Sequence, residues 1–470
     1  MAGPTARVGE RQTVIGPRLR RFAAGYRGFS RNTRVFIASS FLTSAAFGLF
    51  FVNFNLYLAA RGFSPATIGL VATTTGLTLA AAAVPASILA NHLGRRLTMM
   101  LGAISCAIAL IGFLLIDATV AIFGLAVLYG IGQQLLGIPA SPFLTENSTD
   151  AQRNEVFALN AATFNLAQVL TGLSAGALVG VLALGGGGPG QIATFHVLLV
   201  AMLALIAGAT LLLSRLSDDR GSIDRAPGGV ATPESFQPAY PAPRLRTRLS
   251  RIGVHFGDAG TFLKLVAPGF LIAVGAGQVL PFLNLFIYGK FGIDLSEINV
   301  IFAVSALGTM IAILIQPGIA RRFGKISSVV MVQAASIPLF FVLGFAPWIW
   351  LVIAGMAVRN ALMNAGNPIF GAFAMERVRP VERATLAATM SMSWSIGGAI
   401  GGTIYSTVQS ALGFERGYNL NFLTIIVLYA LATFLYWAWF GRAERAERLR
   451  EAREGPSPVA AAGRPINPAP

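Results

Sequence analysis

The chain contains 470 residues, of which 55% are hydrophobic and only 11% are charged. Soluble proteins carry roughly 25% charged residues. This deficit, together with a mean hydropathy of +0.68, excludes a soluble globular protein and indicates an integral membrane protein. The formal net charge of +16 would suit a nucleic-acid partner, but basic flanks that face anionic lipid explain it without one. The expected macromolecular surroundings are therefore a lipid bilayer and no nucleic acid.

Apolar runs of about 20 residues or more follow one another along the chain, and each is long enough to cross roughly 30 Å of hydrocarbon as a helix. A membrane-spanning barrel would instead show alternating segments of about ten residues, which the sequence lacks. The sequence therefore predicts an all-α integral membrane protein with twelve transmembrane helices. The predicted spans are residues 35–60, 66–90, 97–116, 120–143, 156–184, 192–214, 265–289, 297–320, 326–346, 348–374, 384–412 and 419–441.

The positions of the basic residues predict how these spans are oriented. Of the 35 Lys and Arg residues, 31 fall on one side of the membrane and three on the other, and Arg359 lies inside a span. Basic residues collect in cytoplasmic segments, so both termini are predicted to be cytoplasmic. No cleavable signal precedes the first span, which favours a multi-pass protein of the plasma membrane. The predicted domains are a basic N-terminus (1–34), a six-helix bundle (35–214), a cytoplasmic linker (215–264), a second six-helix bundle (265–441) and a charged, then disordered tail (442–470).

Landmark residues recur along the chain at a fixed offset of 230. Gly62 with Gly292 and Glu146 with Glu376 are two such pairs, and charged residues and glycines at the ends of segments rarely recur by chance. Further pairs are Gly94 with Gly324, Arg95 with Lys325, Arg153 with Arg383 and Gly172 with Gly402. A parallel repeat of this size in a hydrophobic chain is typical of a transporter built from two like halves.

The turn after the second span carries Gly94, Arg95 and Arg96, preceded by Asn91 and His92. This turn resembles the signature of the major facilitator superfamily, although Asn91 stands where that family has an acid. Residues 321–325, Arg-Arg-Phe-Gly-Lys, keep part of the same pattern in the second half. The resemblance covers all twelve spans and implies two pseudo-symmetric six-helix bundles that alternate in exposing a central site.

Charged residues at the cytoplasmic ends of the spans are candidates for a gate. Glu146 and Glu376 occupy equivalent places, and each is followed seven residues later by an arginine. The family resemblance implies a charge network here that closes in the outward-facing state, while the alternative is a set of solvated loop charges worth about 0 to 1 kcal/mol each. The candidate gate residues are Gly94, Arg95, Arg96, Glu146, Arg153, Arg322, Gly324, Lys325, Glu376 and Arg383.

Small residues and prolines mark places where helices pack or bend. Glycines at helix-packing spacing in the fifth and eleventh spans let helix backbones approach closely in lipid. The candidate helix-packing glycines are Gly172, Gly176, Gly397 and Gly401. Pro139 and Pro368, near the cytoplasmic ends of the fourth and tenth spans, are predicted to bend these helices.

Arg359 is predicted to lie near the middle of the bilayer, where an arginine costs about 2.5 to 3.5 kcal/mol on insertion scales. None of the 19 acidic residues falls at that depth, so amides, backbone carbonyls, water or a bound anion must satisfy the guanidinium. Arg359 is either a packing residue or a substrate ligand. Its equivalent at the offset of 230 is Tyr129, so this charge is particular to the second half.

Amide side chains surround the predicted position of Arg359 on helices that the resemblance places around a central cavity. Each amide either binds the solute or joins helices by hydrogen bonds. The candidate substrate-binding residues are Arg359, Asn360, Asn364, Gln134, Gln133, Asn53, Gln278 and Asn284. Asn53 and Asn55 point in different directions on a helix, so at most one of them is expected to face the cavity.

The sequence favours a secondary transporter that moves a small organic solute by rocker-switch alternating access, with an anionic solute as the sharper hypothesis. No carboxylate is predicted at membrane depth and no phosphate-binding loop is present, so uniport or exchange is favoured over carboxylate-based proton coupling. The alternatives are an efflux carrier for drugs or other apolar compounds and a non-transporting membrane sensor or scaffold. No enzyme activity, cofactor or metal is expected. The protein is expected to be a monomer.

Overall fold

The computed structural model describes residues 28–182, 189–217, 259–323, 325–378 and 383–441, and these ranges contain helices and no strands. Most of the predicted N-terminus and linker, and the whole predicted tail, lie outside the described residues. The helices of the first half are α2 (Arg31–Ala60), α3 (Pro65–Leu93), α4 (Arg95–Leu115), α5 (Thr119–Gly137), α6 (Ala140–Glu146), α7 (Asp150–Leu182) and α8 (Pro189–Ser214).

The second half repeats this order. Its elements are α10 (Ala259–Val279), the short 3-10 helix η3 (Leu280–Phe282), α11 (Leu283–Phe291), α12 (Leu295–Phe323), α13 (Lys325–Phe345), α14 (Ile349–Glu376), α15 (Arg383–Tyr436) and the π-helical turn η5 (Trp437–Gly441). Among the described residues, nine helical segments are long and apolar enough to span a membrane. The last of these contains two helices joined at Gly413, and two shorter apolar helices complete the twelve. The predicted all-α fold with twelve spans is confirmed.

The repeated glycines occupy turns that require their conformational freedom. Gly62, after the first span, and Gly292, after the seventh, have positive φ angles of 81° and 63°. A residue with a Cβ is strained in this region, so the turn needs the same residue in both halves. Gly94 has a φ of 90° for the same reason, while its partner Gly324 lies outside the described residues. Gly62 and Gly292, which lie 230 residues apart, therefore occupy turns of the same geometry in the two halves.

Prolines break two of the predicted spans. The fourth span ends as α5 at Gly137 and resumes as α6 after Pro139, as the sequence predicts. The seventh span is interrupted at η3, which contains Pro281 and which the sequence reading missed. Proline lacks an N–H and its ring clashes with the preceding turn, so the helix tightens there. Helix α14 continues through Pro368 without a break.

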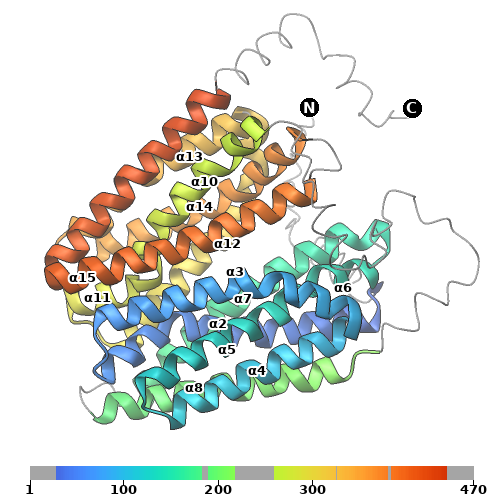
Figure 1. Ribbon diagram of the computed structural model, residues 1–470, viewed down its shortest axis with the longest axis horizontal. Coiled ribbons are helices and arrows are strands. Elements are labelled where there is room, and N and C mark those ends of the chain that lie inside the picture. Colours follow the sequence, from blue (N-terminus) through green and yellow to red (C-terminus); the bar gives the residue numbers. More distant parts are fainter. Residues whose placement is uncertain (1–27, 183–188, 218–258, 324, 379–382, 442–470) are drawn as a thin grey trace, which may run out of the picture.

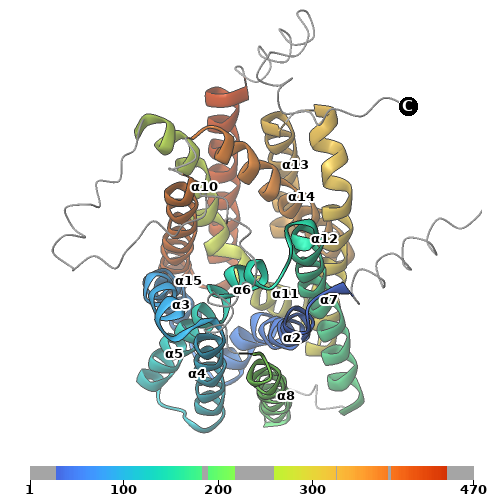
Figure 2. The same ribbon diagram turned by 90° about the vertical axis from the view of Figure 1, so that its right-hand side faces the viewer.

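The two halves meet at one end of the molecule and diverge toward the other, as Figure 1 shows, and Figure 2 views them from the diverging end. We name the diverging end the basic end, because Arg95, Arg96 and Lys325 begin helices there. Helix α3 packs against α15, and α7 packs against α12. Hydrogen bonds join the halves at the opposite end. There the Thr73 hydroxyl donates to Ala399 O at 3.2 Å.

Glycines allow the closest helix crossings. A Cβ added to Gly172 on α7 would lie 2.8 Å from the Cβ of Ala303 on α12, in the other half. Gly176 lies on the same crossing, where its carbonyl oxygen accepts a hydrogen bond from the Ser296 hydroxyl at 2.7 Å. On α15, Gly397 and Gly401 pack against α10 of their own half.

Candidate functional site

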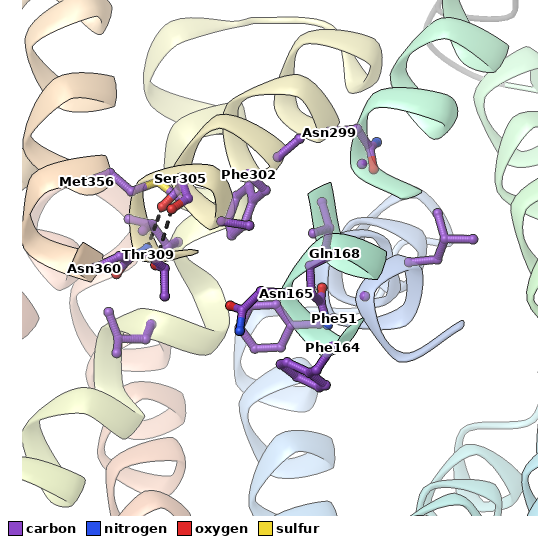
Figure 3. A pocket seen from close by; sticks show the side chains of 18 residues that line it. Phe51, Phe164, Asn165, Gln168, Asn299, Phe302, Ser305, Thr309, Met356 and Asn360 are labelled. Carbon is purple, nitrogen blue, oxygen red and sulfur yellow. Dashed lines mark hydrogen bonds between the residues drawn. The ribbon is translucent and has the colours of Figure 1, made fainter. Parts of the chain in front are cut away.

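A cavity of about 240 Å³ lies between the two halves. Helices α2 and α7 of the first half form one wall, and η3, α11, α12 and α14 of the second half form the other. Figure 3 shows aromatic and amide side chains gathered around it. The polar and aromatic residues among its lining are Phe51, Phe164, Asn165, Gln168, Asn299, Phe302, Ser305, Thr309 and Asn360. None of the 18 described residues that line this cavity is charged.

Asn360 is the candidate ligand that the structure places on the cavity wall. Its Nδ2 donates to the Ser305 hydroxyl at 2.6 Å, across from α14 to α12. The Thr309 hydroxyl, one turn further along α12, donates to Ser305 O at 3.2 Å and also faces the cavity. The second half therefore presents a row of neutral hydrogen-bonding groups.

Arg359 lies behind this row and does not line the cavity. Its side chain is 4% exposed, and the guanidinium lies over the Phe340 ring at 4.6 Å from the ring centroid. One terminal nitrogen donates to the Tyr429 hydroxyl at 2.9 Å, and the other donates to Asn360 Oδ1 at 2.9 Å. The arginine thus fixes the orientation of the Asn360 amide, whose other end faces Ser305.

Asn53 joins the two halves. Its amide exchanges hydrogen bonds of 3.0 and 3.1 Å with Asn299 on α12, and both side chains are buried. Asn299 also lines the cavity, so this amide pair joins the halves beside the cavity. Asn55 donates to Pro281 O at 2.5 Å, and neither Asn53 nor Asn55 lines the cavity.

The remaining candidate ligands contact protein groups away from the cavity. Asn284 donates to Val52 O at 2.6 Å and so joins the halves, and Gln134 donates to Leu79 O at 2.5 Å within the first half. Gln278 donates to Val274 O at 3.3 Å in its own helix, and Gln133 does not line the cavity. The side chain of Asn364 lies outside the described residues.

The basic end carries two equivalent ion pairs. Arg95 at the start of α4 contacts Glu146 at the end of α6 with an N–O distance of 3.1 Å, and Lys325 contacts Glu376 at the same place in the second half. Each pair lies within one half. Arg96 donates to Ser214 O at 2.6 Å, again within the first half. Arg153 is partly buried on α7, and the side chains of Arg322 and Arg383 lie outside the described residues.

Neutralising these acids is expected to have small and additive effects. Both pairs are substantially exposed, and exposed ion pairs contribute about 0 to 1 kcal/mol. Glu146→Gln and Glu376→Gln should each lower the melting temperature in detergent by less than about 3 °C. Because the two pairs lie in different halves, the double variant should show the sum of the single effects. A clear departure from additivity would instead indicate a charge network shared between the halves.

Several cavity residues were missed by the sequence reading. Asn165 and Gln168 on α7, with Ser305 and Thr309 on α12, are ordinary polar residues of apolar helices, and no motif marks them. One signal was available, since Gln168, Gly172 and Gly176 recur every four residues and therefore share one helix face. On that face Gly172 and Gly176 pack against α12 of the other half, whereas Gln168 lies over Gly48 of α2 in its own half.

Comparison with known proteins agrees with this arrangement. The model of the Major Facilitator Superfamily matches residues 36–402 and 270–468, which together cover most of the chain. The chain belongs to the major facilitator superfamily. This transporter matches no curated protein sequence. Its family membership and helical fold identify a membrane-spanning carrier and not an enzyme.

Solved transporter structures share the fold at low sequence identity. A mutant form of the nucleoside transporter NupG superposes with a TM-score of 0.70 at 17% identity, covering 87% of this chain and 100% of that one. A bacterial homologue of the human lysosomal transporter Spinster gives 0.66 at 16% identity, with 87% and 97% covered. The D-xylose-proton symporter gives 0.65 at 12%, with 86% and 96% covered. These likenesses establish the fold of this transporter.

Proposed function

We propose that this protein is a secondary transporter of the plasma membrane that carries a small, uncharged organic solute with polar groups on one edge and an apolar face. The observation that carries the proposal is the cavity between the halves, whose described lining combines amides and hydroxyls with phenylalanine rings and includes no charged residue. Amides and hydroxyls can both donate and accept hydrogen bonds. The rings of Phe51, Phe164 and Phe302 offer faces for a planar or apolar group.

The surroundings of Arg359 favour a neutral solute over an anion. A buried anion needs a charged partner, and the guanidinium would have to leave the Phe340 ring and the Tyr429 hydroxyl to reach it. A purely apolar solute is also disfavoured, because it would offer no hydrogen bond to the amides and hydroxyls of the lining when it displaced water. Nucleoside-like and sugar-like solutes combine the required features, and two of the structurally similar proteins are a nucleoside transporter and a D-xylose-proton symporter.

Alternating access follows from how the halves are joined. The hydrogen bonds of Asn53, Asn284 and Ser296 hold the halves together opposite the basic end, while the ion pairs at the basic end stay within each half. Basic residues collect on the cytoplasmic side, so this conformation opens its cavity toward the cytoplasm. Rocking of the two six-helix halves about the cavity would then expose it to the outside.

Counterflow in proteoliposomes tests the proposed solute class. Vesicles containing the full-length protein are loaded with unlabelled uridine, D-xylose or benzoate, and the entry of the matching labelled compound is measured. Uridine or D-xylose should show counterflow, and benzoate should not. Counterflow of benzoate alone would replace the neutral solute with an anionic one. Binding of a solute without counterflow of any compound would favour a membrane sensor.

Transport is expected to be independent of a proton gradient. None of the described residues that line the cavity is an acid, a histidine or another group that titrates near neutral pH, so these residues offer no proton carrier. A pH difference of about one unit across the vesicle membrane should change the initial rate of counterflow less than about twofold, and a protonophore should have no effect. Concentrative uptake driven by an acid exterior would contradict uniport or exchange.

A further inference from the structure

A second cavity, of about 220 Å³, lies wholly within the second half and separate from the cavity between the halves. Its walls come from α10, α13, α14 and α15, and most of its lining is apolar. Phe370 and Val266 are among the apolar residues, and Gly269 and Gly366 each leave space where a side chain would stand. The nearest atom to a Cβ added at Gly366 would be Val332 Cγ1 at 3.7 Å, so a larger residue could be accommodated there.

Two positions that line this cavity carry larger residues at the equivalent places of the first half. At the offset of 230, Gly366 corresponds to Leu136 and Val329 corresponds to Met99. Leu136 and Met99 are 8% and 1% exposed, so their larger side chains are packed inside the first half. At these two positions the second half carries the smaller residue of each pair. Ordinary packing would favour filling the space in both copies.

The second half also adds polar groups to the space that it leaves open. Gln333 corresponds to the buried Ala103 of the first half, and its side chain is only 7% exposed. Its Oε1 accepts a hydrogen bond from Thr433 at the long distance of 3.5 Å, and its Nε2 has no hydrogen-bond partner among the described residues. The Tyr436 hydroxyl, which lies 3.7 Å from the position of a Cβ at Gly269, has no partner among them either.

We propose that this cavity is a second binding site, for a small uncharged molecule that has an apolar body of one or two rings and a single hydrogen-bonding group. An apolar cavity of about 150 Å³ binds benzene, so the space suits a somewhat larger body. The amide of Gln333 and the hydroxyl of Tyr436 provide partners for one polar group on the ligand. A lipid acyl chain would leave both groups unpaired. Trp394, which lines the cavity and is 51% exposed, marks its rim.

Binding of 4-methylphenol, with toluene as the matched compound that lacks the hydroxyl, tests this site. Full-length protein in lipid nanodiscs is examined by equilibrium dialysis, and empty nanodiscs correct for partition into lipid. The wild type should bind 4-methylphenol about threefold to tenfold more tightly than toluene, the range expected for one net hydrogen bond. Gln333→Ala should remove this preference without affecting toluene. Equal binding of the two compounds to the wild type would overturn the assignment of a polar ligand.

Variants that restore the residues of the first half locate the binding. Gly366→Leu should weaken the binding of 4-methylphenol at least tenfold by filling the cavity, and Val329→Met provides a second such variant if the first folds poorly. Gly371→Leu is the matched control, because it lies on the same helix outside the cavity and a Cβ there meets nothing within 4 Å. Unchanged binding in the cavity-filling variants, or equal loss in the control, would overturn the proposed site.

Discussion

Replacing Arg359 with methionine is expected to slow solute counterflow at least tenfold while leaving the melting temperature unchanged or slightly higher. The guanidinium donates to Asn360 Oδ1, and without this bond the amide can rotate away from the cavity. A hydrogen bond to a charged group is worth about 1.5 to 3 kcal/mol, which corresponds to a loss of roughly tenfold to a hundredfold. Stability should not fall in the same way, because a charge at membrane depth is itself unfavourable.

Two variants separate this positioning role from general packing. Tyr429→Phe keeps the aromatic ring and removes only the hydroxyl that accepts from Arg359, so Asn360 keeps its donor and transport should fall less than about threefold. Asn360→Leu should reproduce the loss seen with Arg359→Met, and combining the two changes should add little further loss. If the Arg359 variant abolished benzoate counterflow and left uridine counterflow intact, Arg359 would be a direct ligand of an anion.

Gly172→Leu is expected to drive the protein out of the conformation described here. The added side chain would meet Ala303 and Asn299 at the crossing of α7 and α12, and the halves would have to separate at that end. Overpacking of this kind costs about 1 to 3 kcal/mol, enough to shift a two-state equilibrium roughly fivefold to 150-fold. The expected result is a larger population that is open opposite the basic end, together with slower counterflow.

Thiol labelling measures this shift. The only cysteine, Cys106, is buried, so Cys106→Ala provides a silent background. A cysteine introduced at Phe51, which lines the cavity and is 53% exposed, should react more slowly with an impermeant reagent added at the basic end when Gly172→Leu is present. Gly124→Leu is the control, since a Cβ there meets nothing within 4 Å. Equal labelling in both variants would show that the crossing does not govern access to the cavity.

The spans could be predicted from the sequence because crossing a membrane imposes a length and an apolar composition on each helix separately. The offset of 230 likewise marked turns that need glycine, since Gly62 and Gly292 both have positive φ. The break at Pro281 was also readable in principle. It was missed because the apolar run continues on both sides of that proline.

The cavity could not be predicted in the same way, because it depends on how two separate bundles dock. The amides of Asn53 and Asn284 were predicted to be possible ligands. Each instead forms a hydrogen bond with a residue more than 200 positions away, in the other half. Arg359 was correctly expected to need a partner other than an acid. That the partners include the ring of Phe340 and the hydroxyl of Tyr429 follows from helix packing, which local sequence does not encode.

The hydrogen bonds that join the halves opposite the basic end determine how the protein responds to salt concentration. Asn53 with Asn299, Asn284 with Val52 and Thr73 with Ala399 all join uncharged groups. Dissolved ions shorten the reach of charge interactions from about 10 Å at 0.1 M to about 3 Å at 1 M, but they act little on neutral hydrogen bonds. The contacts that join the halves at this end are therefore expected to change little between dilute and concentrated salt.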